Sequence, residues 1–258
     1  MKFVFDLDGT ICFKGNPLSD PIIKALDRIA MEGHEVIFAS ARPIRDLLPI
    51  LPVHLHHAPM IGGNGGFVYK GGKPVSSIQL EASIGKRIID LLMEYEAAYL
   101  MDSLWDYSYT GDPEHPIRKN LDPEIRAKNV RFDELKEIVK VVVLSSKDSV
   151  KLINELEKLP IRMYTHGTED IIDISPDGID KWVGLQALGL KPGEYIAFGN
   201  DINDIPMFQY AHHSICVGDH AALREMASES IRGEETAVVR KIDEIAVDLR
   251  SGNNRFKR

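Results

Sequence analysis

The stretch Phe3-Val4-Phe5-Asp6-Leu7-Asp8-Gly9-Thr10 decides the fold, because an apolar run ends there in two carboxylates and a glycine. An apolar strand buried on both faces belongs to a parallel sheet, and open parallel sheets bind ligands beyond the carboxyl ends of their strands. Asp6 and Asp8 are therefore expected at that edge. Residues two apart in a strand share a face, so both carboxylates could reach one ligand or metal ion. The alternative is a strand followed by an ordinary turn, and other segments must decide.

Length and composition limit the class of protein. The 258 residues suffice for one large α/β domain, or for a core domain that carries a second, smaller one. A net charge of −8 argues against nucleic acid or an anionic membrane as partner. The two cysteines, Cys12 and Cys216, favour a reducing compartment. Without a signal-peptide pattern or a long apolar stretch, the expected location is the cytoplasm.

The first part of the chain alternates between strands and helices. Residues 20–33 predict a helix that has proline in its first turn and glycine beyond its end. A second strand is expected over residues 35–40, and a third apolar segment runs into the glycine-rich residues 62–66, with a hairpin through residues 70–73. This order predicts an α/β domain.

The middle of the chain has a different character, and we expect it to form an inserted α+β module over residues 79–177. Its predicted elements are a helix at 83–96, aromatic alternating segments at 99–109, a polar loop at 111–123, a strand at 139–144, a helix at 147–159 and a strand at 161–165. The first domain resumes near Lys181 with a helix, a buried strand at 195–198 that runs into the acidic loop GNDIND, a strand at 214–217 and a C-terminal helical region.

Four strand or helix ends carry polar motifs in a fixed chain order. They are DLDGT with Asp6 and Asp8, ASAR with Ser40, DKW with Lys181, and the loop GNDIND at 199–204. Together they resemble the four motifs of the haloacid dehalogenase-like (HAD) phosphohydrolase superfamily. The segment GGNGG with Asn64 resembles the asparagine turn of its Cof-type branch.

The resemblance implies a Rossmann-like parallel-sheet HAD core over residues 1–78 and 178–258, with an inserted α+β cap over 79–177. The segment between Thr10 and Ser40 has room for one helix and no domain, so the insertion occupies the second cap position. There it resembles the IIB cap of Cof-like sugar and small-metabolite phosphatases.

The chemistry explains the residue types. A phosphomonoester dianion repels a carboxylate, so Asp6 can attack phosphorus only if a cation neutralises the phosphoryl oxygens, and Mg²⁺ suits such an all-oxygen site. The resemblance implies that Asp6 forms an aspartyl-phosphate and that Asp8 protonates the leaving oxygen and then activates water. Ser40 would bind the phosphoryl group, and Lys181 would balance charge between that group and Asp6. Lys181 also lies at a predicted helix start, where a cation opposes the macrodipole.

Further residues around these motifs complete the expected site. The substrate is expected to contact Gly9, Ser40, Ala41, Arg42, Asn64, Lys181 and Asn203. The expected metal ligands are Asp6, Asp8 (also through its backbone carbonyl), Asn200, Asp201 and Asp204.

The last loop departs from the family pattern Gly-Asp-x-x-Asn-Asp, because Asn200 stands where the metal-binding aspartate is usual. An asparagine oxygen can coordinate Mg²⁺ but brings no charge. Either Asn200 is the ligand and metal affinity falls, or Asp201 turns inward and replaces it. We favour Asn200 and expect Asp204 to orient metal-bound waters or Lys181.

Several other polar or aromatic residues have ordinary structural explanations that outweigh functional ones. Metal binding by the histidine group is not favoured, Cys12 is expected to pack rather than react, and the cap aromatics are expected in its core or lining the leaving-group pocket. His115 and Arg118 in the polar loop could touch an anionic substrate. The histidine group comprises His54, His56 and His57, and the aromatics are Tyr95, Tyr99, Trp105, Tyr107 and Tyr109.

Three functions fit the motifs. The first is a Mg²⁺-dependent phosphatase of small phosphorylated metabolites, such as sugar phosphates or phosphorylated cofactors. The second is phosphomutase-type transfer, and the third is a phosphometabolite-binding protein that its altered last loop has left with little activity. Cap closure would exclude water between turnovers, with hinges expected at Gly71, Gly72 and Pro74 and at Pro176 and Gly178.

Overall fold

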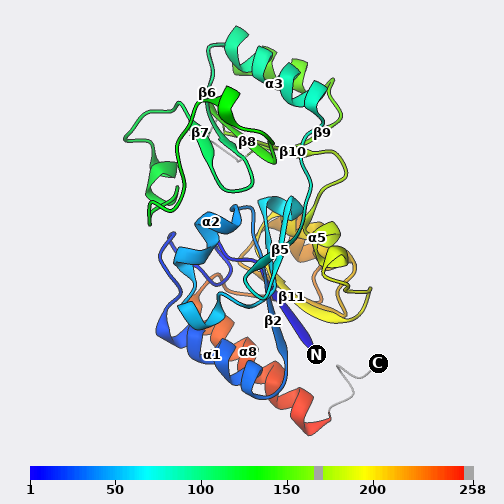
Figure 1. Ribbon diagram of the computed structural model, residues 1–258. Coiled ribbons are helices and arrows are strands. Elements are labelled where there is room, and N and C mark those ends of the chain that lie inside the picture. The colour runs from blue at the N-terminus through cyan, green and yellow to red at the C-terminus, as the bar shows by residue number, and fades with distance from the viewer. Residues whose placement is uncertain (166–170, 253–258) are drawn as a thin grey trace.

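The computed structural model describes residues 1–165 and 171–252, and it contains two β-sheets with their helices, one above the other in Figure 1. The larger sheet is built from strands at both ends of the chain, and the smaller sheet from the middle. We propose that the first unit, the core, comprises residues 1–78 and 178–258, and that the second, the cap, comprises residues 79–177.

The core sheet has eight strands in the order β13-β12-β11-β1-β2-β3-β4-β5, parallel from β13 to β3 and antiparallel at β4 and β5. These strands are β1 (Lys2–Phe5), β2 (Glu35–Ala39), β3 (Met60–Gly62), β4 (Phe67–Lys70), β5 (Lys73–Ser77), β11 (Tyr195–Gly199), β12 (His213–Val217) and β13 (Glu229–Ile231). The core helices are α1 (Asp20–Met31), α2 (Ile44–Leu47), α5 (Lys181–Ala187), α6 (Ile205–Gln209), α7 (Ala221–Met226) and α8 (Glu235–Ser251).

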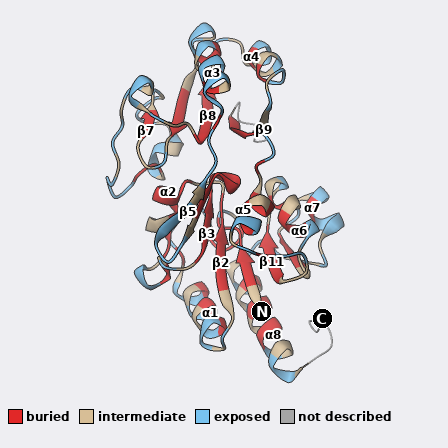
Figure 2. Ribbon diagram, turned by 45° about the vertical axis from the view of Figure 1, so that its right-hand side comes forward, coloured by how far each residue is buried: buried red, intermediate tan, exposed pale blue. Residues whose placement is uncertain are grey.

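The apolar strand β1 is covered on both faces. Phe3 and Phe5 point into the cluster that α1 and α8 close, whereas Val4 points to the opposite face, under α5 and α6. All three side chains are fully buried, and burial of each is worth about 1.5–3 kcal/mol relative to exposure. Figure 2 shows the buried strands between exposed helix surfaces. The expected Rossmann-like layering of the core is confirmed.

The cap is an antiparallel sheet with two helices on one face. Its strands follow the order β7-β6-β8-β10-β9, and one face packs against the helices through Met101, Val141 and other apolar side chains. The next residues along the same strands, such as Asp102 and Lys140, turn to the core, as the two-residue period of a strand requires. The cap elements are α3 (Ala82–Glu94), β6 (Ala98–Asp102), β7 (Tyr107–Tyr109), β8 (Lys140–Ser145), α4 (Ser149–Leu156), β9 (Ile161–Thr165) and β10 (Ile172–Pro176).

The sequence analysis did not predict two of the strands, β10 and β13. β10 alternates apolar and polar residues, but the acidic and glycine-containing segments around it suggest a turn. β13 has only three residues and lies at the sheet edge, inside the region expected to be helical. Both strands depend on pairing with neighbours distant in sequence, β8 and β12, more than on local pattern.

The hinge expected at Gly71, Gly72 and Pro74 is wrong. Gly71 and Gly72 form the turn of the β4–β5 hairpin, with φ angles of 62° and 73°, Pro74 lies in β5, and the hairpin belongs to the core sheet. Two consecutive positive φ angles are the conformation that a two-residue hairpin turn needs. The chain passes to the cap only after β5, over residues 78–81.

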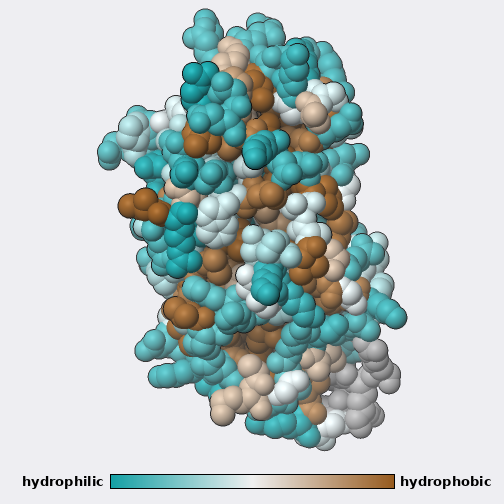
Figure 3. Space-filling view, viewed as in Figure 1, coloured by the Kyte–Doolittle hydropathy of each residue, from teal (hydrophilic) through white to brown (hydrophobic). Residues whose placement is uncertain are grey.

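No single large apolar patch dominates the face of the molecule that Figure 3 shows. Hydrophilic residues cover most of this face, with hydrophobic ones between them (Figure 3). The most exposed large hydrophobic residues, Met31, Val53, Ile125 and Val150, come from separate parts of the chain. Scattered exposure of this kind is usual for globular proteins. None of the described helices is both long enough and apolar enough for a membrane span.

Candidate active site

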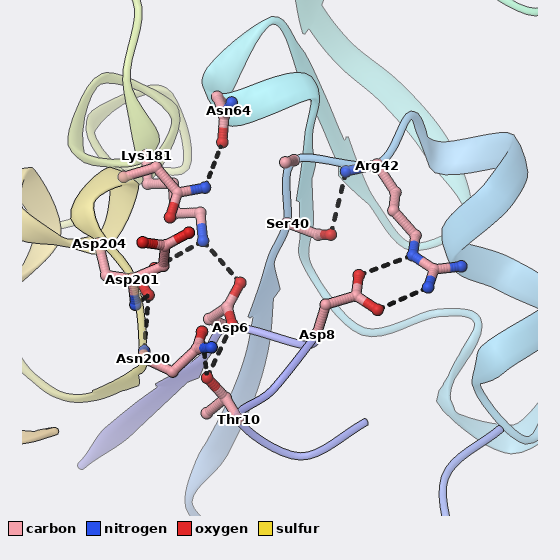
Figure 4. Close-up of polar contacts among 12 residues, drawn as sticks. Asp6, Asp8, Thr10, Ser40, Arg42, Asn64, Lys181, Asn200, Asp201 and Asp204 are labelled. Atoms are coloured by element: carbon pink, nitrogen blue, oxygen red, sulfur yellow. Dashed lines mark hydrogen bonds and ion pairs between the residues drawn. The ribbon is translucent and has the colours of Figure 1, made fainter. Parts of the chain in front are cut away.

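The sequence motifs meet at the carboxyl edge of the core sheet. Asp6, Ser40 and Asn200 directly follow the neighbouring strands β1, β2 and β11, and Asn64 lies in the turn after β3. Because these strands are adjacent and parallel, their ends deliver the side chains to one place. Figure 4 shows Asp6 at the centre, with Lys181 and Asn200 on one side and Asp8 on the other.

Lys181 is buried between two carboxylates. Its Nζ donates to Asp6 Oδ1 at 2.7 Å and to Asp204 Oδ1 at 2.6 Å, and the lysine side chain has 0% exposure. Lys181 is the first residue of α5, whose N-cap Asp180 accepts a hydrogen bond from the Val183 N–H. The helix cap thus fixes the start of α5, and the start of α5 aims the ammonium group at the sheet edge.

The charges of this group depend on one another. Burial and the Asp204 carboxylate raise the pKa of Asp6 to about 7, against the attraction of Lys181. Burial alone would lower the pKa of Lys181, but the carboxylates of Asp204 and Asp6 raise it above its ordinary value. Lys181 therefore stays charged at neutral pH, between the two carboxylates that it contacts.

Asp204 holds the last loop in place. Its Oδ2 accepts hydrogen bonds from the backbone N–H groups of Asn200 and Asp201, at 2.8 and 3.1 Å. With Oδ1 on Lys181, both carboxylate oxygens are engaged within the protein. This arrangement favours the expectation that Asp204 orients Lys181.

Asn200, rather than Asp201, is turned to the nucleophile candidate. The Thr10 hydroxyl lies 2.7 Å from Asp6 Oδ2 and 3.2 Å from Asn200 Oδ1, so these two oxygens lie beside the same hydroxyl group. A Cβ on Gly9, whose φ is 81°, would lie only 2.1 Å from Asn200 Nδ2, which is why residue 9 must be glycine. The Asp201 carboxylate instead accepts from the Ile202 N–H.

Ser40 is positioned as a donor. Its buried Oγ accepts the Arg42 N–H at 3.1 Å, which leaves the hydroxyl hydrogen to donate to a bound group. The Ser40 backbone is fixed on both sides, because its N–H donates to Ile61 O and its carbonyl accepts from the Asn64 N–H.

The Asp8 side chain points in a different direction from the Asp6 side chain. Its carboxylate is half-exposed and binds the Arg42 guanidinium through both oxygens, whereas Asp6 is buried against Lys181 (Figure 4). The expectation that both side chains reach one ligand rested on strand alternation, but β1 ends at Phe5 and the alternation ends with it.

Asn64 and Asn203 contact each other through their side chains. Asn203 Nδ2 donates to Asn64 Oδ1 at 3.0 Å, and Asn64 is buried with a φ of 55°. The turn that carries Asn64 lies against the start of α5, since a Cβ on Gly65 would be 2.2 Å from the Asp180 carbonyl oxygen. Asn64 thereby links the ends of β3 and β11 to the helix that carries Lys181.

A cavity of about 450 Å³ opens between the core and the cap. The core contributes Asp8, Ala41 and Arg42 to its wall, and the cap contributes Lys140, Asp102 and apolar side chains including Leu100 and Val142. The residue expected to protonate the leaving group therefore faces a space large enough for a small metabolite.

The sequence analysis missed a buried charge network that joins the two units. Arg45 has an almost fully buried side chain and binds Asp46 at 2.7 Å, Asp102 of the cap at 2.8 Å and the Trp105 carbonyl oxygen at 2.9 Å. Its guanidinium also lies over the Tyr107 ring, 4.6 Å from the centroid. Lys140 makes a second link, to Ala41 O at 2.7 Å. The only sequence signal was charged residues at the ends of apolar runs.

The Asp102 carboxyl should make the stability of the protein depend on pH. Among the described residues its buried Oδ2 has no hydrogen-bond partner, and burial raises its pKa to about 6 against the attraction of Arg45. The folded state then binds a proton more tightly than the unfolded state, so stability falls as pH rises from about 4 to about 6.

The variant Asp102→Asn tests this prediction, because its side chain cannot titrate. We expect the free energy of unfolding of the wild type, relative to this variant, to fall by about 2–3 kcal/mol across that window. Urea titrations of both proteins measure it, and a pH-independent difference would contradict the network as described.

The histidines and the cysteine for which a structural role was expected make structural contacts. His54 contacts Asp27, and His56 contacts the carbonyl oxygens of Leu48 and Leu51. Burial raises the pKa of the Cys12 thiol to about 12, so this cysteine is not activated.

The cap residues considered for substrate contact lie elsewhere. Arg118 stacks on the Tyr109 ring at 5.3 Å, and His115 accepts from the Ile117 N–H. Tyr99 is buried in the apolar cluster of the cap. Ile117 and Asn120 of the same polar loop line the cavity instead.

The whole chain can be compared with known proteins. A family model for haloacid dehalogenase-like hydrolases matches residues 3–240. The chain belongs to the haloacid dehalogenase-like hydrolase family. With the family, the expected enzyme class, a HAD-like phosphatase, is confirmed.

Named relatives of this HAD-like chain are phosphatases. The 5-amino-6-(5-phospho-D-ribitylamino)uracil phosphatase YitU of Bacillus subtilis is 24% identical, over 93% of this chain and 95% of its own length. Among solved structures, SMU.1108c from Streptococcus mutans UA159 has a TM-score of 0.80 at 19% identity, over 95% and 98% of the two chains. The HAD subclass IIB sugar phosphatase BT4131 has a TM-score of 0.76 at 16% identity, over 95% and 99%. The latter two likenesses show the fold.

Proposed function

We propose that the protein is a Mg²⁺-dependent phosphatase that hydrolyses small phosphorylated metabolites through an aspartyl-phosphate on Asp6. The observation that supports this most is the placement of Asp6. Its carboxylate is held by Lys181 and Thr10 at the sheet edge, beside Asn200. Its family relatives, including a phosphatase of a phosphorylated ribitylaminouracil, act on small phosphorylated compounds.

The proposed reaction proceeds in two halves. An Asp6 oxygen attacks phosphorus, the bond from phosphorus to the ester oxygen breaks, and Asp8 gives that oxygen its proton, so that an alcohol leaves. Asp8, now a carboxylate, takes a proton from water while the water oxygen attacks phosphorus. The bond from phosphorus to Asp6 breaks, inorganic phosphate leaves, and both aspartates return to their first state. Ser40 donates to a phosphoryl oxygen, and Lys181 offsets negative charge on Asp6.

The residues around Asp6 fit Mg²⁺. Asp6 Oδ2 and Asn200 Oδ1 both lie within hydrogen-bond distance of the Thr10 hydroxyl and are therefore neighbours, and Mg²⁺ typically takes one or two carboxylates with phosphate and water oxygens. The described part of the chain has no cluster of three or more His, Cys, Asp or Glu residues suited to a metal, so backbone, phosphate and water would supply the other ligands. Bound there, Mg²⁺ would neutralise phosphoryl charge as Asp6 approaches.

Asn200→Asp should tighten Mg²⁺ binding. The variant adds a negative charge next to the Asp6 carboxylate, and we expect the dissociation constant of Mg²⁺ to fall about tenfold or more. Isothermal titration of Mg²⁺ into the substrate-free protein measures this without turnover. The matched control is Asp201→Asn, whose carboxylate bonds to its own loop and should matter little. Weaker binding in Asn200→Asp, or a large loss in Asp201→Asn, would identify Asp201 as the ligand.

The activity itself is tested with p-nitrophenyl phosphate. Inorganic phosphate should be released with Mg²⁺ and not with EDTA, and without an added acceptor. Release only when an acceptor alcohol is supplied would instead favour phosphoryl transfer to that acceptor. Mg²⁺-dependent binding without any turnover would favour a binding protein.

A further inference from the structure

Arg42 and Asp8 form an ion pair that conflicts with catalysis. The guanidinium donates through Nε to Asp8 Oδ2 at 2.7 Å and through Nη2 to Asp8 Oδ1. Each oxygen of a paired carboxylate keeps a second lone pair, but a proton on either one would remove the negative charge on which its pairing with the guanidinium depends. Asp8 must therefore leave Arg42 before it can serve as the acid of the proposed reaction.

Releasing Asp8 leaves a cation that needs another partner. The Arg42 side chain is only 13% exposed, so solvent alone does not replace the lost carboxylate well. The nearby carboxylate of Asp46 is already engaged by Arg45 through both oxygens and by the Asp122 N–H. The replacement must therefore come from the cavity, whose wall includes both Arg42 and Asp8.

The other cation of the cavity wall, Lys140, does not depend on a carboxylate that the reaction needs. Lys140 binds Asp173 at 2.6 Å and the Ala41 carbonyl oxygen at 2.7 Å, and neither partner has a role in the proposed reaction. Lys140 is thus satisfied by structural contacts. Among the described residues that line this cavity, Arg42 is the cation whose carboxylate partner is needed elsewhere during turnover.

We propose that Arg42 binds a second anionic group on the substrate and thereby frees Asp8. This inference rests on the proposed phosphatase function and specifies its substrate class: phosphate esters whose leaving group carries a carboxylate or a further phosphate. The second anion lies close to the ester oxygen, because Arg42 now touches the carboxylate that must reach that oxygen. When the substrate lacks a second anion, Asp8 must leave Arg42 without another anion to take its place.

A matched pair of substrates tests the proposal. 2-Phosphoglycolate and 2-hydroxyethyl phosphate differ in a carboxylate against a hydroxymethyl group, and p-nitrophenyl phosphate reports activity toward a leaving group without a second anion. In the wild type with Mg²⁺, kcat/KM should be 10- to 100-fold higher for 2-phosphoglycolate, the usual worth of a charge-assisted hydrogen bond. In Arg42→Gln this ratio should fall to about 1, because the loss falls on 2-phosphoglycolate and not on the ester without a second anion. The Arg42 backbone N–H that contacts Ser40 is unchanged in this variant.

The control is Arg118→Gln, which removes a cap arginine that stacks on Tyr109 outside the cavity lining and should leave the ratio as in the wild type. A wild-type ratio near 1, or a ratio that persists in Arg42→Gln, overturns the role of Arg42 while p-nitrophenyl phosphate turnover still supports the phosphatase. Absence of turnover with all three esters overturns the phosphatase and this inference together. Arg42→Lys, which keeps the charge but only one donor direction, should retain part of the preference.

Discussion

Asp6→Asn is expected to lower kcat for p-nitrophenyl phosphate by at least about 10⁴-fold, in line with the loss of other enzymes' covalent nucleophiles. The amide keeps the size of the side chain and can still accept from Thr10, but it cannot attack phosphorus. Initial rates of phosphate release with saturating Mg²⁺ measure the effect. Asp90→Asn, in an exposed position on α3, is the control for a lost carboxylate and should retain full activity.

The same variant separates catalysis from folding. Removing one of the two carboxylates that share Lys181 also removes the like-charge contact with Asp204, which contributes to the raised pKa of Asp6. We therefore expect thermal stability to be kept or slightly increased while activity disappears. A variant that remains folded and retains more than a tenth of the wild-type rate would contradict the role of Asp6.

Lys181→Met is expected to lower the free energy of unfolding by about 3–5 kcal/mol, as removal of one partner from a buried ion pair usually does. It leaves the carboxylates of Asp6 and Asp204 facing each other without the cation that lies 2.7 and 2.6 Å from them. Urea unfolding at pH 7 in EDTA, followed by circular dichroism, measures the loss. Phosphatase activity should fall with it, because Asp6 loses both its orientation and its charge balance.

The double variant Lys181→Met/Asp204→Asn is the matched control. It removes one of the two uncompensated carboxylates, while the asparagine oxygen can still accept from a loop N–H group. We expect it to be more stable than Lys181→Met alone, and it remains informative if the single variant does not fold. Strictly additive losses would show that the three charges do not form a coupled unit.

The sequence predicted the core of the site because its signals are local. Asp6, Ser40 and Asn200 each end an apolar strand, and parallel strands bring such ends together regardless of the loops between them. Lys181 was identified by the resemblance of DKW to a family motif, with its unfavourable place at a helix start as support, and the structure shows what offsets that cost.

The parts that sequence could not predict depend on contacts between distant segments. Arg45 meets Asp102 across the boundary of core and cap, and nothing in either local sequence indicates the other. The different directions of Asp6 and Asp8 follow from where β1 ends and from Arg42, which lies on another strand end. Side-chain direction beyond the last strand residue is decided by such tertiary partners.

The most direct test of the central claim is to trap the phosphorylated enzyme. Asp8→Asn should slow hydrolysis of the intermediate, because it removes the carboxylate proposed to activate water. The variant is mixed with p-nitrophenyl phosphate and Mg²⁺, quenched with acid within milliseconds to seconds, digested and analysed by mass spectrometry, beside Asp6→Asn/Asp8→Asn as control. The account predicts a phosphate adduct on the peptide that contains residues 3–10, localised to Asp6 and absent from the control. Release of p-nitrophenol in the first turnover with no adduct on Asp6 at any quench time would contradict it.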